Sequence, residues 1–490
     1  MKKYLFFLII PLTVIILYHP ALFTFFSQDD FFHFKVSLTD GSFLQFIDLF
    51  GFHPFAVRGI AFYRPIFREA LFNIFYLQFG LNPLPFRLLQ FLILFLNSFL
   101  AFYLINKIFK NKFLSFFVAF FYAISSAQVS PLYYLAGGIQ VLGATTFLLL
   151  TLILSLENLP LSFITFLLAL GSHELASIIP FLISALFFVR FSLNKAFKNI
   201  CKILPFFLVL FIYLYQEITR IGFSAAEKQY QTVFSAKTVL NSYMWYVGWA
   251  LGLPEMLIDF VFPGFKLNPS LMRYWGNYYI VIFSAFFISL FLLILGASYL
   301  LLKKRRTILN KKTFFLLFWF FAGLFPVILL PLHKSTQYLE TVLVAFWTII
   351  GLIAFSIYNR SKISRAYLFI LILSLFILSA TSAILQKTTY WAAKRGKYAK
   401  QLISQVTTTY PTLPKGSIIY FTNDPSYPFV ASEWGSSSKQ ASFILNNQDA
   451  LRLVYKDPSL KVYYELPAAY AAGFPHISSF ACPKSSSPCC

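Results

Sequence analysis

The chain has 490 residues, of which 59% are hydrophobic and 12% are charged, and its mean hydropathy is +0.72. Apolar runs near the length of a bilayer crossing recur along it, which excludes a soluble globular protein and indicates a polytopic, mostly α-helical membrane protein. Lysine and arginine exceed aspartate and glutamate by 40 − 17 = 23.

The basic residues lie mainly in short loops between apolar runs. In a soluble protein this excess would suggest nucleic acid binding. Here it sets the topology, because basic residues concentrate in cytoplasmic loops. We therefore expect no nucleic acid partner, and an anionic lipid or lipid phosphate is a secondary interpretation.

The first apolar run covers residues 4–26 and follows Lys2 and Lys3. A cleaved signal peptide is one interpretation, but the run is long and ends in phenylalanine without a small-residue cleavage site. We interpret it as an uncleaved first helix with both lysines inside. Residues 27–83 then form one outer loop, in which 65–80 is too short to cross easily and is expected to be interfacial or re-entrant.

Ten further spans are expected after this loop, and they give about eleven in all, with the N-terminus inside and the C-terminus outside. The four strongest basic clusters agree with this topology. The mixed region 216–277 is expected on the outer face or as a re-entrant segment, because Pro254, Glu255 and Asp259 interrupt its apolar part. Whether 240–262 crosses the membrane is left open. The further spans are 85–105, 113–131, 139–156, 161–171, 176–191, 203–215, 278–302, 314–332, 342–357 and 366–385.

The composition changes after residue 386. Residues 390–405 are typical of a basic amphipathic helix, and short strand-like runs follow, separated by turn signals. We predict a transmembrane domain over 1–386, a small α/β domain over 387–482 on the outer face, and a disordered tail over 483–490. The strand-like runs are 417–422, 441–445, 451–455 and 461–465.

Two adjacent carboxylates, Asp29 and Asp30, follow the first span in a chain with only 17 acidic residues. A carboxylate at a membrane boundary is costly unless it is solvated, paired or used. A solvated interfacial loop is the alternative interpretation of this pair.

The expected topology brings several polar groups to the same outer face. Singly, each has a structural explanation: His173 and Glu174 could cap a helix pair, and His333 with Lys334 could anchor the interface. Their shared face favours a substrate site, because polar groups at membrane depth tend to mark one. The candidate residues are Asp29, Asp30, His33, Arg64, His173, Glu174, His333, Lys334 and Tyr338.

Several motifs resemble the GT-C class of membrane glycosyltransferases over residues 1–350, most closely the branch with protein O-mannosyltransferases and the aminoarabinose transferase of lipid A. The acidic pair, the Tyr63-Arg64-Pro65 step and the Phe79-Gly80-Leu81-Asn82-Pro83 turn occur in that branch's order. Ser172-His173-Glu174 is similar to its Ser/Thr-Lys-Glu/Gly motif. Pro331-Leu332-His333-Lys334 with Tyr338 resembles its His-Tyr-Pro region.

This sequence departs from the family's pattern at two places in the candidate site. Gly137-Gly138-Ile139-Gln140 stands where relatives often carry an acid, and His173 stands where they often have lysine. The resemblance therefore leaves open whether a divalent metal, Mg²⁺ or Mn²⁺, is bound.

The resemblance implies a transferase that moves a sugar from a polyprenyl-phosphate donor to a hydroxyl of a protein, glycan or lipid acceptor, on the outer face of the cytoplasmic membrane. Asp29 would be the general base, which can contribute ~10²–10⁴-fold. Asp30 would orient it or bind the acceptor, and the two could exchange roles. Arg64, with Lys334 as a second candidate, would hold the leaving phosphate. Glu174 would orient the acceptor or His173.

Two other functions stay open. A transporter or flippase for a lipid-linked or anionic solute would place charges deep within spans and often show two related halves. A non-catalytic membrane scaffold would need the acidic pair only as a solvated loop.

Overall fold

The computed structural model describes residues 5–191, 193–221, 230–303, 310–358, 361–424 and 436–465. The predicted disordered tail, 483–490, lies outside these ranges. The chain divides into two compact units. The first unit comprises Met1–Ala21, Phe50–Phe67 and Arg87–Tyr390, and the second comprises Leu22–Leu49, Arg68–Phe86 and Trp391–Cys490. These units divide the chain differently from the domains expected above, whose boundaries remain predictions.

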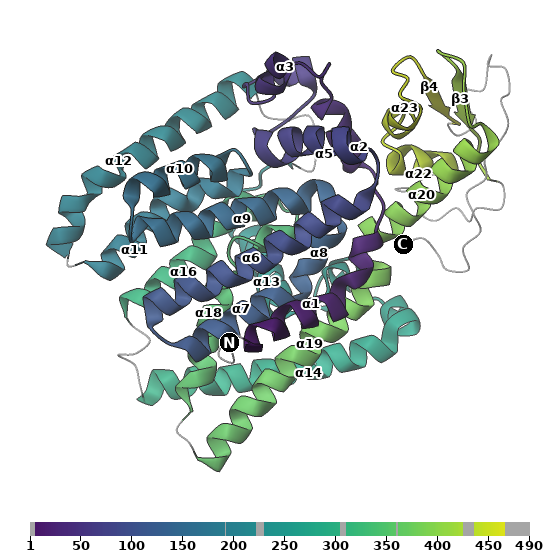
Figure 1. Ribbon diagram of the computed structural model, residues 1–490. Coiled ribbons are helices and arrows are strands. Elements are labelled where there is room, and N and C mark those ends of the chain that lie inside the picture. The colour runs from purple at the N-terminus through teal and green to yellow at the C-terminus, as the bar shows by residue number, and fades with distance from the viewer. Residues whose placement is uncertain are drawn as a thin grey trace. The chain divides into compact units, whose positions relative to one another are not determined.

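The first unit is helical and contains one short hairpin (Figure 1). The hairpin pairs β1 with β2 in antiparallel orientation. Its helices are α1 (Ile9–Tyr18), α4 (Phe55–Arg58), most of α6 (Pro83–Phe109), α7 (Lys112–Ile124), α8 (Val129–Tyr133), α9 (Leu135–Ser155), α10 (Leu159–Leu170), α11 (Ile179–Arg190), α12 (Leu193–Gln216), α13 (Ala236–Leu251), α14 (Pro269–Lys303), α16 (Lys311–Gly323), α17 (Phe325–Ile328), α18 (Leu343–Ser356) and α19 (Lys362–Thr389). Its shorter elements are η1 (Leu5–Leu8), η4 (Ser126–Gln128), η5 (Glu174–Ile178), η6 (Glu217–Ile221), η8 (Glu255–Phe260), η9 (Thr336–Leu339), β1 (Val261–Phe262) and β2 (Lys266–Leu267). Two turns bridge the units along the chain, η2 (His19–Phe23) and the π-helical η3 (Pro65–Ala70).

Among the described residues, six helices are long and apolar enough to cross a membrane, or up to seven if one bent pair counts as a span. The chain is therefore a helical, multi-pass membrane protein, as its composition predicts. Three of the expected spans are apolar helices of only 10–17 residues. The six are Pro83–Phe109, Leu135–Ser155, Cys201–Ile221, Pro269–Lys303, Lys311–Ile328 and Lys362–Thr409, and the shorter helices are Ile9–Phe23, Leu159–Leu170 and Leu343–Ser356.

The bent pair replaces the straight span expected over 113–131. Asn111 starts α7 by accepting hydrogen bonds from the N–H groups of Phe113 and Leu114, both at 3.1 Å. This satisfies two donors that a helix start leaves without partners. Ser125 then leaves the helical region (φ −51°, ψ 135°) and caps η4. The α7 and η4–α8 helices consequently meet at a bend of 41°.

The interruption expected near Pro254 is confirmed. Helix α13 ends at Leu251, and Gly252 follows with φ +126°, a conformation that favours glycine. Beyond Pro254 the chain forms η8 and the β1–β2 hairpin rather than more helix.

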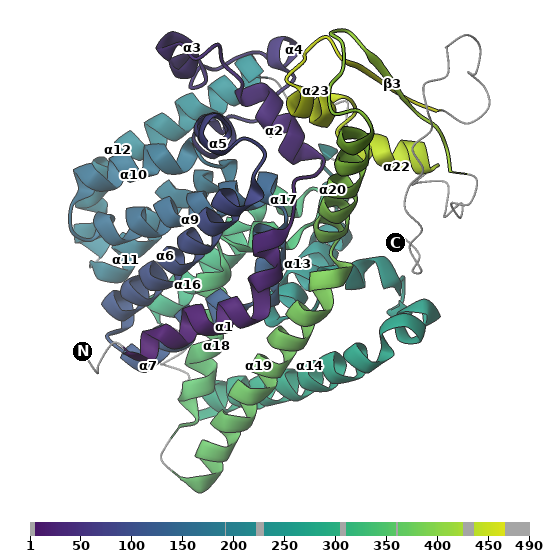
Figure 2. The same ribbon diagram turned by 45° about the vertical axis from the view of Figure 1, so that its right-hand side comes forward.

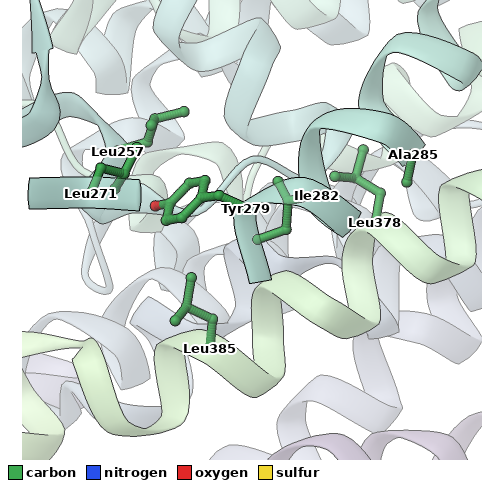
Figure 3. Packing of buried hydrophobic residues seen from close by; sticks show 7 residues of the cluster. All are labelled: Leu257, Leu271, Tyr279, Ile282, Ala285, Leu378 and Leu385. Atoms are coloured by element: carbon green, nitrogen blue, oxygen red, sulfur yellow. The ribbon is translucent and has the colours of Figure 1, made fainter. Parts of the chain in front are cut away.

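The long helices α14 and α19 lie side by side in both views (Figures 1 and 2). Buried residues on α14 recur every three or four positions, which is the spacing of one helix face. Gly296 continues this face, and a Cβ there would lie 2.5 Å from Tyr367 Oη. The cluster drawn in Figure 3 comprises Leu257, Leu271, Tyr279, Ile282, Ala285, Leu378 and Leu385.

The second unit joins the segment after the first span to the C-terminal segment. Helices α2 and α23 pack against each other (Figure 2), and Lys35 Nζ pairs with Asp449 Oδ1 at 3.1 Å. Strands β3 and β4 pair in parallel, with Ile418 opposite Lys461. The elements are α2 (Asp29–Ser37), α3 (Phe43–Asp48), α5 (Leu71–Phe79), α20 (Trp391–Thr409), β3 (Ile418–Phe421), α22 (Ser437–Ile444), α23 (Asp449–Tyr455) and β4 (Lys461–Tyr464).

The predicted amphipathic helix and the strands over 417–422 and 461–465 are confirmed as α20, β3 and β4. The strands predicted over 441–445 and 451–455 are wrong, because these residues form α22 and α23. In α22 the buried positions Ser437, Ala441 and Ile444 follow the helical spacing. Short apolar runs do not distinguish strand from helix by periodicity alone.

Candidate functional site

An ion pair between Arg64 and Glu174 forms the centre of the candidate site. Arg64 Nε donates to Glu174 Oε2 at 2.8 Å, and Nη2 donates to Oε1 at 2.6 Å. Arg64 Nη1 donates to Gln140 Oε1 at 2.8 Å. The two charged side chains are 15% and 24% exposed. Such a bidentate, charge-assisted pair is among the stronger polar contacts in proteins.

Backbone contacts hold the two segments together. Ile66 N–H donates to the carbonyl oxygen of Gly171 at 3.1 Å, which joins the turn after Arg64 to the end of α10. Gly143 on α9 accommodates Phe67, since a Cβ there would lie 2.0 Å from the ring. Arg64 also directly precedes the π-helical turn η3, and such turns often occur at functional sites.

The pair controls the ionisation of both groups. Burial is the largest single influence and would raise the pKa of Glu174, but the charges of Arg64 and His173 and the hydrogen bonds to the carboxylate together outweigh it and lower that pKa to about 2. Burial likewise opposes the charge of Arg64, yet Glu174 raises the pKa of Arg64 above its ordinary value. Both groups are therefore charged over the whole physiological range.

Aromatic rings surround the pair. Tyr338 of η9 lies with its ring centroid 6.3 Å from that of His173 and 5.7 Å from that of His333. The ring centroid of Tyr230 lies 4.8 Å from that of His333, and the two rings are tilted by 57°. Tyr338 and Tyr230 both lie close enough to Arg64 to act on its charge.

His173 has the capping role that the sequence left as one alternative. Its Nδ1 accepts the N–H of Leu175 at 3.2 Å, at the start of η5. Because Nδ1 is then an acceptor, the proton of the neutral ring lies on Nε2. Glu174 Oε2 is 3.4 Å from the same Nδ1.

Lys334 follows His333 in the chain and donates from Nζ to Asn241 Oδ1 of α13 at 3.0 Å. Burial lowers the pKa of Lys334. This lysine is thus held by an amide on α13.

Sequence reasoning missed three residues near the pair. Gln140 is fully buried and bonds Arg64, although the sequence marked it only as a departure from a family pattern. Glu217 accepts from Tyr63 N–H at 2.8 Å, and Tyr230 lies in the same mixed region. An uncharged amide in an apolar helix was the available signal for Gln140. Nothing local distinguished Glu217 or Tyr230.

Asp29, Asp30 and His33 belong to the second unit, at the start of α2. Asp30 is 1% exposed, and its Oδ2 accepts the N–H of Ser27 at 3.0 Å. Asp29 is only partly buried. His33 is 8% exposed and packs its ring 5.3 Å from Phe72.

The residue before the acidic pair is strained. Gln28 has φ +55° and ψ −116°, a conformation that L-residues rarely adopt. Two contacts from the C-terminal segment hold it: Gln28 N–H donates to Ile444 O at 2.8 Å, and Arg395 donates to Gln28 Oε1. Strain of this kind is often stored at functional sites, which favours a role for the turn.

The chemistry available at the first-unit site is anion binding. A guanidinium has five N–H groups, and the pair with Glu174 and Gln140 uses three of those of Arg64. Among the described residues the other two N–H groups have no hydrogen-bond partner, which leaves them for an anionic oxygen. Within the described ranges, no group of three or more His, Cys, Asp and Glu side chains is arranged to hold a metal ion.

The chain matches no family model, no curated protein and no solved structure.

Proposed function

We propose that the chain is a membrane glycosyltransferase that uses a polyprenyl-phosphate sugar donor and a hydroxyl acceptor. In this proposal the protein crosses the cytoplasmic membrane about eleven times, with the N-terminus inside and the C-terminus and the active site outside. The motif order of the sequence suggests this function, the local geometry of one turn carries the proposal, and the geometry of the Arg64 site supports it.

The observation that carries the proposal is the strained turn before α2. Asp30 is buried, and its carboxylate accepts the backbone N–H of Ser27, so it stabilises the turn. Asp29 is the more accessible acid and is held on a backbone that the C-terminal segment clamps at Gln28. A base must be fixed in position before it can take a proton during attack. We therefore assign the base to Asp29 and the positioning of the turn to Asp30.

The second support is the Arg64 site. Two N–H groups beyond the bonds to Glu174 and Gln140 could bind the lipid phosphate as it leaves, because cationic donors stabilise the charge that develops there. His173, His333, Lys334 and Tyr338 would line the same site, while His33 would support the turn of Asp29.

The test uses the full chain in proteoliposomes with a panel of polyprenyl-phosphate sugars, and it follows release of polyprenyl phosphate. We expect turnover by the wild type and a loss of ~10²–10⁴-fold in Asp29→Asn. Asp40→Asn is the matched control, because Asp40 is an exposed acid of the same segment that bonds only near neighbours, Ser42 among them.

Unchanged turnover in Asp29→Asn would remove that carboxylate from the mechanism. Absence of turnover with every donor, in protein that retains its thermal transition, would count against the transferase and favour the transporter or scaffold.

A further inference from the structure

A second buried acid, Glu340, lies between η9 and α18. It is 1% exposed, and its Oε1 accepts the hydroxyl of Tyr122 on α7. The side chain of Gln128 also lies close enough to stabilise the carboxylate. Gln128 Nε2 donates to the carbonyl oxygen of Tyr122 at 3.1 Å, so the three residues form one cluster.

This acid has no cationic partner. Among the described residues, no lysine, arginine or histidine forms an ion pair with Glu340. The titratable groups on the elements that pack against η9 include Tyr133 of α8, Tyr246 of α13 and Tyr338 of η9 itself, and Glu255 accepts a hydrogen bond from Thr336. None of them adds a positive charge.

The cluster also has more acceptors than donors. In the described part of the chain, Glu340 Oε2 and Gln128 Oε1 are buried and have no hydrogen-bond partner. A buried acceptor without a donor costs about 1–3 kcal/mol, and a buried carboxylate without a cation costs more. A proton on Oε2 removes the negative charge of Glu340 and turns that oxygen into a hydrogen-bond donor. The neighbouring amide of Gln128 has an oxygen, Oε1, that lacks a donor among the described residues.

We propose that Glu340 is a proton-binding site. Its carboxyl group holds one proton on Oε2 below neutral pH and releases it to solvent as the pH rises through neutrality. In the protonated state a neutral carboxyl group lies at the junction of η4 with η9. In the deprotonated state a buried negative charge destabilises that junction.

The electrostatics agree with this geometry. Burial raises the pKa of Glu340 to about 7, although Tyr122 and Gln128 partly oppose the shift by stabilising the carboxylate. Glu340 is two residues beyond Tyr338, which lies close enough to Arg64 to act on its charge. The inference stands without any transferase activity, since its tests measure protonation directly.

The experiment records the infrared carbonyl band of protonated carboxyl groups in the purified full chain, from about pH 5 to about pH 9, in KCl. We expect a band that disappears with a midpoint near pH 7 and is missing in Glu340→Gln, which resembles the protonated acid in size and charge. Glu157→Gln removes a half-exposed acid of the same unit and should leave the band intact.

A second variant keeps the test informative if Glu340→Gln folds poorly. Tyr122→Phe removes the hydroxyl that stabilises the carboxylate, so the midpoint should move to higher pH. The same pH series is also recorded in NaCl, to test whether sodium competes with the proton for the site.

Three results would overturn the proposal. The first is a band that is identical in the wild type and in Glu340→Gln. The second is a band that persists unchanged to about pH 9, which would make Glu340 a permanently neutral structural group. The third is a midpoint that falls when sodium replaces potassium, which would make a metal ion the occupant instead of a proton.

Discussion

Two carboxylates of the first unit, Glu174 and Glu340, differ in their partners and in their exposure: the side chain of Glu174 is 24% exposed, whereas Glu340 is 1% exposed. Glu174 forms a bidentate pair with Arg64, and its pKa falls to about 2. Glu340 accepts a tyrosine hydroxyl and has no cationic partner among the described residues, and its pKa rises to about 7. Burial penalises the charged form in both cases. The difference teaches that a cationic partner fixes the charge of one carboxylate, while deeper burial without such a partner among the described residues makes the other a titrating group.

The largest effect should come from removing the cation at the first site. Arg64→Leu leaves Glu174 charged and unpaired, and we expect a loss of about 3–5 kcal/mol in the free energy of unfolding. Thermal unfolding in detergent measures it. The double variant Arg64→Leu with Glu174→Leu should recover most of this loss, because two apolar groups then replace the pair. A single variant as stable as the wild type would show that Glu174 finds another partner.

A variant of Gln140 tests how much the second partner of Arg64 contributes to the ion-pair site. Gln140→Leu removes the acceptor of Arg64 Nη1, and we expect a loss of about 1–3 kcal/mol, because a charged donor in a buried site then lacks a partner. Thr348→Val is the matched control, since Thr348 is equally buried and, within the described ranges, its hydroxyl bonds only the carbonyl of Val344. Equal losses of unfolding free energy in the two variants would show that the hydrogen bond to Arg64 stabilises the fold no more than an ordinary buried hydroxyl bond does.

The two acids should also give pH profiles of opposite sign. The pKa of Glu174 is lower in the folded state, so its stabilisation is present above the ordinary glutamate pKa and is lost as the pH falls toward about 2. The pKa of Glu340 is higher in the folded state, so the fold loses stability as the pH rises through about 7.

Glu340→Gln should therefore gain stability relative to the wild type as the pH is raised. Between about pH 6 and about pH 8.5 the gain should reach about 1–1.5 kcal/mol, because one unit of pKa difference is about 1.4 kcal/mol. Unfolding curves at each pH in both proteins measure it. A constant difference between the two proteins would contradict the assignment of the shift to Glu340.

Much of this arrangement could not be predicted from the sequence. The helical membrane class could, because long apolar runs record burial and lipid contact directly. Arg64 and Glu174 could be named as candidates from motifs, but their pairing depends on how η3 meets the end of α10. Glu340 is two residues from a named candidate and was missed, because its partner Tyr122 is 218 residues away in the chain. Local pattern also misread α22 as a strand.

The smallest effect is expected at an exposed pair, and it tests whether burial matters at all. Lys107 pairs with Glu157 at side-chain exposures of 26% and 42%, and Tyr103 also donates to Glu157 at 3.2 Å. Lys107→Met should cost only about 0–1 kcal/mol, because water and Tyr103 still solvate the carboxylate. The loss should shrink further in high salt, which screens exposed charges. A loss as large as that of Arg64→Leu would mean that pairing alone, without burial, sets the strength of these contacts, and the contrast between Glu174 and Glu340 would then need another cause.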